Sequence, residues 1–171
     1  MKLLFPYGLM ILFSLTATAQ NNALTLNNAA VINLNEGGGI SINQSQASGI
    51  SLIGTGTGYI QSEGETNRVA WHINSGTGNY VIPFGVASTG IKINMTFTVS
   101  AAGSASGTLI ASTYATANNN TSYPTVYAPA VTNMNLLGSG GDQSLFAVDR
   151  FWVLRKANWT TDPVSSLSLS Y

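Results

Sequence analysis

Two glutamates separated by a single glycine are the first candidates for chemistry in this chain. Glu63 and Glu65 flank Gly64, and alternate residues of an extended segment share a face. Paired carboxylates can serve as the acid and base of a glycosidase or as calcium ligands. A glycosidase pair usually comes from separate strands, however, and calcium needs several more oxygens. We therefore expect structural ion pairs that fix strand register: Glu65 with Arg68, and Asp149 with Arg150 or Arg155.

Calcium is the leading functional alternative for these acids. Asp142, in the run Gly140-Gly141-Asp142-Gln143-Ser144, could supply further oxygens to such a site. The same run is also a good turn sequence. We expect no bound cofactor, with Ca²⁺ as the one ion that the acids could hold.

His72 is the only histidine, which excludes a multi-histidine metal site and makes any Ser-His-Asp arrangement depend on this residue. Its neighbours Trp71 and Ile73 would point to the opposite side of a strand. If the aromatic side is the inner one, His72 faces solvent. We expect a surface or edge histidine rather than a catalytic one, and a chain that is not an enzyme.

Flat aromatic rings on a β-surface can stack on sugar rings. Trp71 and Trp152 lie inside alternating segments, where core packing is the simpler account. Trp159 follows in a run of turn residues and is the best candidate for an exposed ring. The glycan contacts that we predict are Trp159, Tyr123 and Tyr127.

The composition narrows the function classes. Charged residues make up 7% of the 171 residues, six basic and six acidic, where about 25% is usual. Asn, Ser, Thr and Gly together account for 72 residues, so most of the polarity is uncharged. A nucleic-acid binder needs a clustered positive field, and a thiol-dependent protein needs cysteine, which this chain lacks. Both classes are excluded, and the small stock of titratable groups argues against a typical enzyme.

Short alternation of apolar and polar residues dominates from Ala23 onward, which is the period of half-buried strands. No stretch has helical periodicity, and glycine-rich runs between the alternating segments are turn formers. The sequence therefore predicts an all-β fold. The clearest strand candidates are residues 24–26, 31–34, 40–42, 50–52, 69–73, 91–99 and 167–171.

Two regions follow a leader. In residues 20–62 the apolar pulses recur every seven to ten residues, which suits either coils of a solenoid or successive short hairpins. In residues 63–171 the strands lengthen and the aromatics and nearly all charges appear, which suits a β-sandwich. Residues 115–129 are predicted as a long surface loop. The alternation in 167–171 runs to the last residue, so we expect an incomplete sandwich with an open edge.

Residues 1–19 have the parts of an export signal. Lys2 gives a positive start, an apolar stretch follows, and Ala17 and Ala19 precede the cleavage point. The stretch is interrupted by Pro6 and Gly8 and is short for a membrane span. We expect cleavage after residue 19, no membrane span in the mature chain, and a secreted or cell-surface location.

Four runs carry a family resemblance: GYIQSEGETNRVAWHINSGTGNYVIPFG (58–85), MTFTVSAAGSASGTLIASTYAT (95–116), YPTVYAPAVTNMN (123–135) and AVDRFWVL (147–154). In them the chain resembles secreted proteins of gliding-type Gram-negative bacteria that leave through the type IX secretion system. The resemblance implies a β-rich exported protein, commonly with repetitive or adhesive regions and a carboxy-terminal sorting domain. No sorting domain is recognisable in these 171 residues. The resemblance supplies no catalytic residues and marks only structural motif positions: Glu63, Glu65, Arg68, Trp71, Asp149, Arg150 and Trp152.

These features predict a non-catalytic structural or adhesive module of an exported protein. Its partners would be surface glycans or other surface proteins, and not nucleic acid. The alternative is a carbohydrate-binding module. A hydrolase that uses Glu63 and Glu65 is a third hypothesis, and it requires both carboxylates to be exposed in a cleft.

Overall fold

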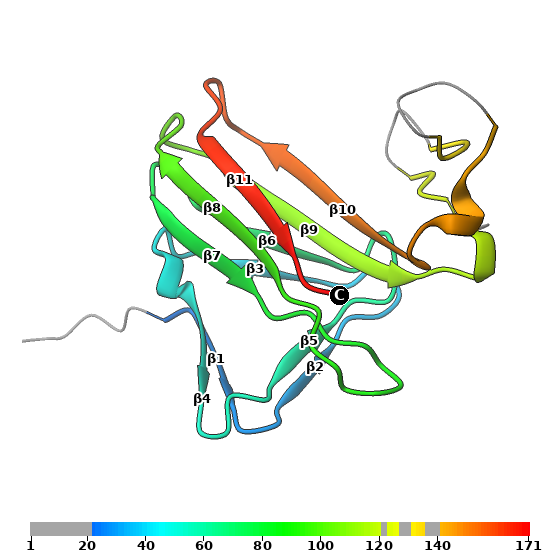
Figure 1. Cartoon of the computed structure of the whole chain (residues 1–171). Coiled ribbons are helices and arrows are strands. Elements are labelled where there is room, and N and C mark those ends of the chain that lie inside the picture. The colour runs from blue at the N-terminus through cyan, green and yellow to red at the C-terminus, as the bar shows by residue number, and fades with distance from the viewer. Residues whose placement is uncertain (1–21, 121–122, 127–130, 136–140) are drawn as a thin grey trace, which may run out of the picture.

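The computed structural model describes residues 22–120, 123–126, 131–135 and 141–171. The predicted all-β class is confirmed, because these residues form strands in four sheets, and their helices are single 3-10 turns. Figure 1 shows short strands at one end of the molecule and longer strands at the other. In the described part of the chain, no helix is long and apolar enough to cross a membrane. The expected signal peptide, residues 1–19, lies outside the described residues.

The N-terminal region is a solenoid of two coils. Each strand of the first coil pairs in parallel with its counterpart in the second. Leu24 lies beside Ile50 and Gly39 beside Arg68, so a coil takes 26 residues at one strand and 29 at another. Successive hairpins would give antiparallel pairs instead, so the parallel pairing decides between the two predicted arrangements. The strands are β1 (Leu24–Asn27), β2 (Val31–Asn33) and β3 (Gly39–Ile42) in the first coil, and β4 (Ile50–Ile53), β5 (Tyr59–Gln61) and β6 (Arg68–Trp71) in the second.

Stacked side chains hold the two coils together. On the inside, Leu26 lies beside Leu52. On the outside, the hydroxyl groups of Thr25 and Ser51 share a hydrogen bond of 3.1 Å. The two-residue period of a strand places these two pairs on opposite sides of the coils. The pattern is incomplete, because Val31 and Ile53 are 48% and 46% exposed.

The turns between strands bring the coils close together. Asn28, which has a φ of 51°, accepts a hydrogen bond from the amide of Thr55 at 3.2 Å through its side-chain oxygen. Gly54 has a φ of 68°, and a Cβ at this position would lie 2.2 Å from the same oxygen. Glycine adopts this conformation at the lowest cost and leaves room for the asparagine. The Asn- and Gly-rich turns are thus where one coil packs on the next.

Two sheets make up the sandwich, with strand orders β10-β9-β6-β3 and β11-β8-β7. β6 pairs in parallel with β3 and in antiparallel fashion with β9. It is therefore both the last strand of the solenoid and an inner strand of the sandwich. The expected boundary at residue 62 falls between β5 and β6, inside the second coil. The remaining strands are β7 (Gly78–Ile82), β8 (Met95–Ala101), β9 (Thr108–Ala115), β10 (Arg150–Ala157) and β11 (Val164–Leu169).

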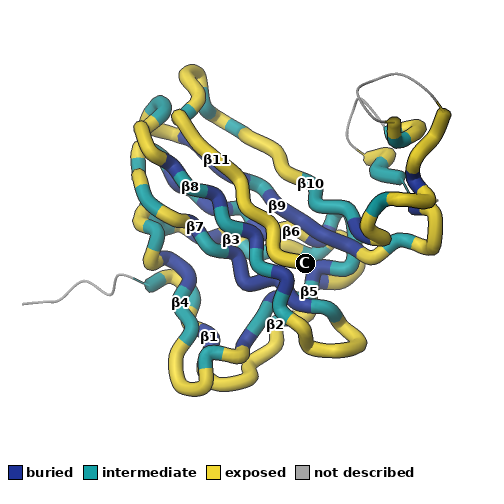
Figure 2. Tube along the Cα trace, in the orientation of Figure 1, coloured by how far each residue is buried: buried dark blue, intermediate teal, exposed yellow. Residues whose placement is uncertain are grey.

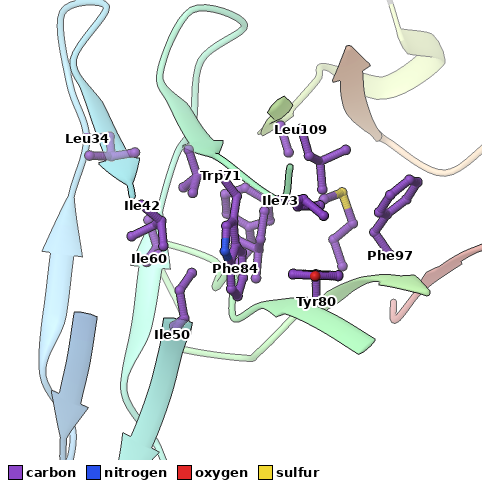
Figure 3. Packing of buried hydrophobic residues seen from close by; sticks show 14 of the residues in the cluster. Leu34, Ile42, Ile50, Ile60, Trp71, Ile73, Tyr80, Phe84, Phe97 and Leu109 are labelled. Atoms are coloured by element: carbon purple, nitrogen blue, oxygen red, sulfur yellow. The ribbon is translucent and has the colours of Figure 1, made fainter. Parts of the chain in front are cut away.

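One hydrophobic core runs through both regions. Its largest fully buried side chains are Trp71, Tyr80 and Phe84, which Figure 3 shows gathered between the sheets. The Trp71 and Tyr80 rings meet edge to face, with centroids 5.2 Å apart. The Trp71 indole N–H donates to the carbonyl of Gln44, and the Tyr80 hydroxyl to that of Ser45, both at 2.7 Å. The buried polar ends are therefore satisfied by the segment between the two coils.

Candidate functional site

Glu63 binds an arginine from a distant strand. Arg150 opens β10, only 4% of its side chain is exposed, and its guanidinium lies 2.9 Å from Glu63 Oε1. The other Glu63 oxygen accepts a hydrogen bond from the backbone amide of Ala115 at 2.9 Å. Arg150 also donates to Thr113 Oγ1 at 3.2 Å. The predicted pair of Arg150 with Asp149 is wrong, because the turn after β5 carries Glu63 to the ends of β9 and β10 while Asp149 stays exposed.

Glu65 anchors the long loop instead of forming an ion pair. Its two carboxylate oxygens accept hydrogen bonds from the backbone amides of Thr125 and Val126, each at 2.9 Å. The prediction that paired it with Arg68 is therefore wrong, because two loop amides occupy both oxygens and Arg68 lies exposed. Glu63 and Glu65 bind different segments of the chain. The hydrolase hypothesis requires both carboxylates to be exposed in a cleft, whereas each is bound by donors of the chain itself.

A turn of residues 62–67, buried at its two ends, Ser62 and Asn67, positions both glutamates. The side chain of Asn67 donates to the carbonyl of Ser62 at 2.5 Å, and the Ser62 hydroxyl donates back to the carbonyl of Asn67. The Asn67 side-chain oxygen accepts from the amide of Gly37 at 2.9 Å, which ties the turn to the first coil. The amide of Thr113 donates to Ser62 Oγ at 3.1 Å and ties it to β9. The sequence analysis did not identify Ser62 and Asn67. The one signal for them is their position on either side of the two glutamates.

Asp142 organises the end of the long loop. Its carboxylate accepts hydrogen bonds from the amide of Met134 at 2.9 Å, from the amide and hydroxyl of Ser144 at 3.1 and 3.0 Å, and from the hydroxyl of Tyr123 at 2.8 Å. These donors, the Met134 amide first, lower the pKa of the carboxyl from the ordinary 3.8 to about 2. Among the described residues, no three acidic or histidine side chains come together as a metal site. Asp142 binds the backbone and side chains of its own turn and of the loop, as its turn sequence predicts.

We expect the loop contacts of Asp142 to persist well into acid. Because the folded-state pKa lies below the ordinary value, the ionised form is favoured in the folded protein. Its contribution is fully present above pH 3.8 and is lost as the pH falls through about 2. Amide NMR signals of Met134 and Ser144 should titrate together near pH 2, and they should not in the Asp142→Asn protein. A joint midpoint near 4 would contradict the assigned contacts.

His72 bridges three strands on the outer side of the sheet. Its Nε2 lies 3.0 Å from the hydroxyl of Ser41, and its Nδ1 lies 3.1 Å from that of Thr108. Trp71 and Ile73 are fully buried on the opposite side, so the predicted direction of His72 is confirmed. A Ser-His-Asp triad needs a carboxylate at the second nitrogen to stabilise the imidazolium, and a threonine hydroxyl supplies no charge. The pairing of both nitrogens fixes the ring as a strand-to-strand link.

Trp159 lies in the connection between β10 and β11 and is partly buried, so the prediction of a freely exposed ring is wrong. A Cβ on Gly107 would come within 1.7 Å of the indole, so the ring occupies space that only a glycine leaves. Its N–H donates to the carbonyl of Asn74 at 3.3 Å. The ring lines a cavity of about 360 Å³ that opens between the two sheets. Phe97, Leu109 and Leu154 form its apolar wall, and the exposed ion pair Lys156–Asp162 lies at its rim.

No protein-family model, curated protein or solved structure matches this chain. The resemblance to proteins of the type IX route therefore remains a hypothesis.

The two tyrosines predicted as glycan contacts have different outcomes. Tyr127 lies outside the described residues. Tyr123 is partly buried, and its ring meets Phe151 edge to face at 6.0 Å. Tyr114 also packs against Phe151, with ring centroids 5.9 Å apart, and burial, with the Glu65 carboxylate adding to it, raises the pKa of Tyr114 to about 12. Tyr123 thus belongs to an aromatic cluster that fastens the loop to the outer face of the sheet.

Proposed function

We propose that this chain is a non-catalytic structural or adhesive module of an exported bacterial protein, secreted or held at the cell surface. The observation that carries the proposal is the use of the acidic side chains. Glu63, Glu65 and Asp142 each bind two or more donors of the chain itself. Acid and base catalysis needs carboxyl groups that reach the substrate, whereas these three hold the loops of the sandwich.

The surface of the solenoid supports an adhesive role. Its outer side carries hydroxyl groups, such as the stacked pair Thr25 and Ser51, together with the exposed apolar side chains Val31 and Ile53. With six basic and six acidic residues in the whole sequence, such a surface approaches polar polymers without a large electrostatic cost. Export is supported by the sequence of residues 1–19, and the type IX route by the resemblance alone. Surface glycans and other surface proteins are the partners that this chemistry suits.

Adhesion measured against salt tests the proposal. We expect the purified chain to be retained on polysaccharide-coated and bacterial surfaces to the same degree at low and at physiological ionic strength, because few charges are available to be screened. We also expect no turnover of glycans or peptides. A fall in retention of about tenfold or more over that range would point to charge-driven binding. Reproducible turnover would overturn the proposal.

A carbohydrate-binding module is the second candidate, and the cavity beside Trp159 favours it. The cavity combines an aromatic ring and apolar walls with the charged rim of Lys156 and Asp162, a mixture of groups that can hold a sugar ring. Binding to one glycan class on an array, weakened about fivefold or more by Lys156→Met or Asp162→Asn, would favour this function. Trp159→Ala is a poor test, because the ring also packs against Gly107. Glycan binding that ignores both rim substitutions would remove the candidate.

A further inference from the structure

Two polar side chains occupy inward-facing positions at the end of the sandwich where β10 connects to β11. Lys156 on β10 pairs in register with Leu109 of β9, and Ser165 on β11 pairs with Val99 of β8. Directly paired residues of adjacent strands share a face, and Leu109 and Val99 are each only 2% exposed. Apolar side chains would complete the core at such positions, so a lysine and a serine there indicate a role other than packing.

The two inward-facing polar residues line the cavity of about 360 Å³ beside Trp159. Phe97 and Leu109 form its floor, and Figure 3 shows them on the same side of the packed core. β10 and β11 supply the side walls, and their connection, with Asp162 and Pro163, forms one end. Figure 2 shows the adjoining half of β10 as exposed, so the cavity opens to solvent between the two outer strands.

Every wall of the cavity comes from segments at a distance from residue 171. Tyr171 contacts Trp152, with ring centroids 6.2 Å apart, and Trp152 precedes Lys156 by four residues, roughly 13 Å along an extended strand. Figure 1 shows the carboxyl end of the chain at the opposite end of β11 from the connection. The shape of the cavity is therefore set by β8 to β11 and by the connection that holds Trp159.

The polar groups at the mouth suit a neutral ligand that is rich in hydroxyl groups. The Lys156 ammonium lies 2.7 Å from Asp162 Oδ1 and 2.5 Å from Oδ2. An anion would meet the carboxylate and a cation would meet the ammonium, so the pair selects against a net charge on the ligand. A hydroxyl group can donate to the one and accept from the other. Arg155 pairs with Ile110 and so belongs to the opposite face of the sheet by position.

The apolar walls suit the carbon face of a ring. The Trp159 indole is held in place, because its N–H donates to the carbonyl of Asn74 and the ring packs against Gly107. A sugar ring carries hydroxyl groups at its edge and C–H groups on its faces, so it can meet the polar rim and the indole together. An acyl chain would leave the pair Lys156–Asp162 without a partner. The volume lies near the lower end of the roughly 300–1,000 Å³ of small-ligand sites, which is room for one ring.

We propose that this cavity binds one neutral sugar unit at the end of a glycan. Two adjacent hydroxyl groups of the sugar bridge Lys156 and Asp162, the Ser165 hydroxyl bonds a further oxygen, and a C–H face lies against Trp159. Because the mouth lies between the outer strands, the rest of the glycan stays outside, and a unit within a chain does not enter. This inference rests on the second candidate function, the carbohydrate-binding module, and gives that function its ligand and its site.

NMR titration of the purified chain with the methyl glycosides of glucose, galactose and mannose tests the inference. We expect at least one of them to shift the amides of Lys156 and Ser165 and the indole N–H of Trp159 together, with a Kd on the order of 1 mM. Analogues that lack one of two adjacent hydroxyl groups should bind about fivefold more weakly, because each such group bonds a charged partner. No shift from any of the three glycosides, or losses spread evenly over all hydroxyl groups, would overturn the proposal.

Filling the cavity provides a matched pair of variants. Ser165→Trp places a large side chain in the cavity and should weaken binding of the effective glycoside about tenfold or more. Ser166→Trp, on the outer face beside Thr98, is the control and should leave binding unchanged. Equal effects of the two tryptophans would contradict the site.

A trisaccharide of the same sugar tests whether a single unit is recognised. It should bind within about threefold of the methyl glycoside, because only its end unit gains contacts. A gain of about tenfold or more would show an extended site and would contradict the inference.

These outcomes separate the inference from the proposed functions. The analogues that lack a hydroxyl group test the site on the unchanged protein, so they decide the matter even if Ser165→Trp fails to fold. Glycan-array binding that depends on Lys156 and Asp162 but ignores Ser165→Trp would keep the carbohydrate-binding candidate and overturn the cavity as its site. Loss of glycoside binding in Ser165→Trp with unchanged retention on surfaces would support the inference and leave the structural or adhesive proposal standing.

Discussion

Replacing Trp71 with alanine is expected to lower the free energy of unfolding by about 3–5 kcal/mol, which is typical for a fully buried aromatic side chain. Trp71 lies beside Ile42 of the first coil and beside Leu109 of β9, so the cavity would open where the solenoid meets the sandwich. Because small domains are stable by only roughly 5–15 kcal/mol, this one change would remove much of the total. Urea denaturation followed by far-UV circular dichroism measures it.

Two further variants separate packing from hydrogen bonding at this position. Trp71→Phe keeps most of the ring volume and removes the N–H that donates to the carbonyl of Gln44. We expect that loss to account for about 1–2 kcal/mol of the effect. Trp152→Ala, at a ring that is only half-buried, should cost less than Trp71→Ala. A loss below about 1 kcal/mol for Trp71→Ala would contradict the central place given to this residue.

The second large effect is expected from Glu63→Gln. The substitution keeps the shape of the side chain and leaves Arg150, whose side chain is 4% exposed, without its opposite charge. Breaking a buried pair from one side costs roughly 3–5 kcal/mol, and the partial exposure of Glu63 places this pair at the lower end of that range. Thermal and urea unfolding at neutral pH should both report the loss.

Two controls test whether burial is the cause. The double variant Glu63→Gln with Arg150→Met removes both charges and should be more stable than Glu63→Gln alone, because no unpaired charge is left inside. Asp162→Asn breaks the exposed pair with Lys156 and should cost less than about 1 kcal/mol. Equal losses from Glu63→Gln and Asp162→Asn would show that the buried setting of Arg150 does not matter.

The all-β class could be predicted from the alternation of the sequence. Whether neighbouring strands pair in parallel or antiparallel fashion could not. A period of two is the same in parallel and antiparallel strands, so residues 20–62 suited coils and hairpins equally. The partner of β1 is β4, a whole coil away, and no local turn signal marks that pairing. Alternation also does not show where a strand begins, which is why the strand expected at 91–99 differs from β8. Alternation continues through those residues, but β8 begins at Met95 because Lys92 instead pairs across a short loop with Gly85.

The residues of the candidate site were predictable where local geometry decided them. The direction of His72 followed from the buried Trp71 next to it. The partner of Glu63 did not follow, because Arg150 is distant in sequence and is brought near only by the pairing of β9 with β10. Trp159 was misjudged for a related reason. Its sequence neighbours are typical of an exposed turn. Its burial depends instead on Gly107, the last residue of the connection between β8 and β9.

The double membership of β6 has a consequence for how the molecule presents its surfaces. A strand hydrogen-bonded to the coil on one edge and to the sandwich on the other leaves no hinge between the two parts. The outer side of the solenoid is therefore held at a fixed angle to the sandwich. A polymer that touches both parts would meet them in one fixed geometry. Two weak contacts would then act together, and attachment would be firm although each contact is weak.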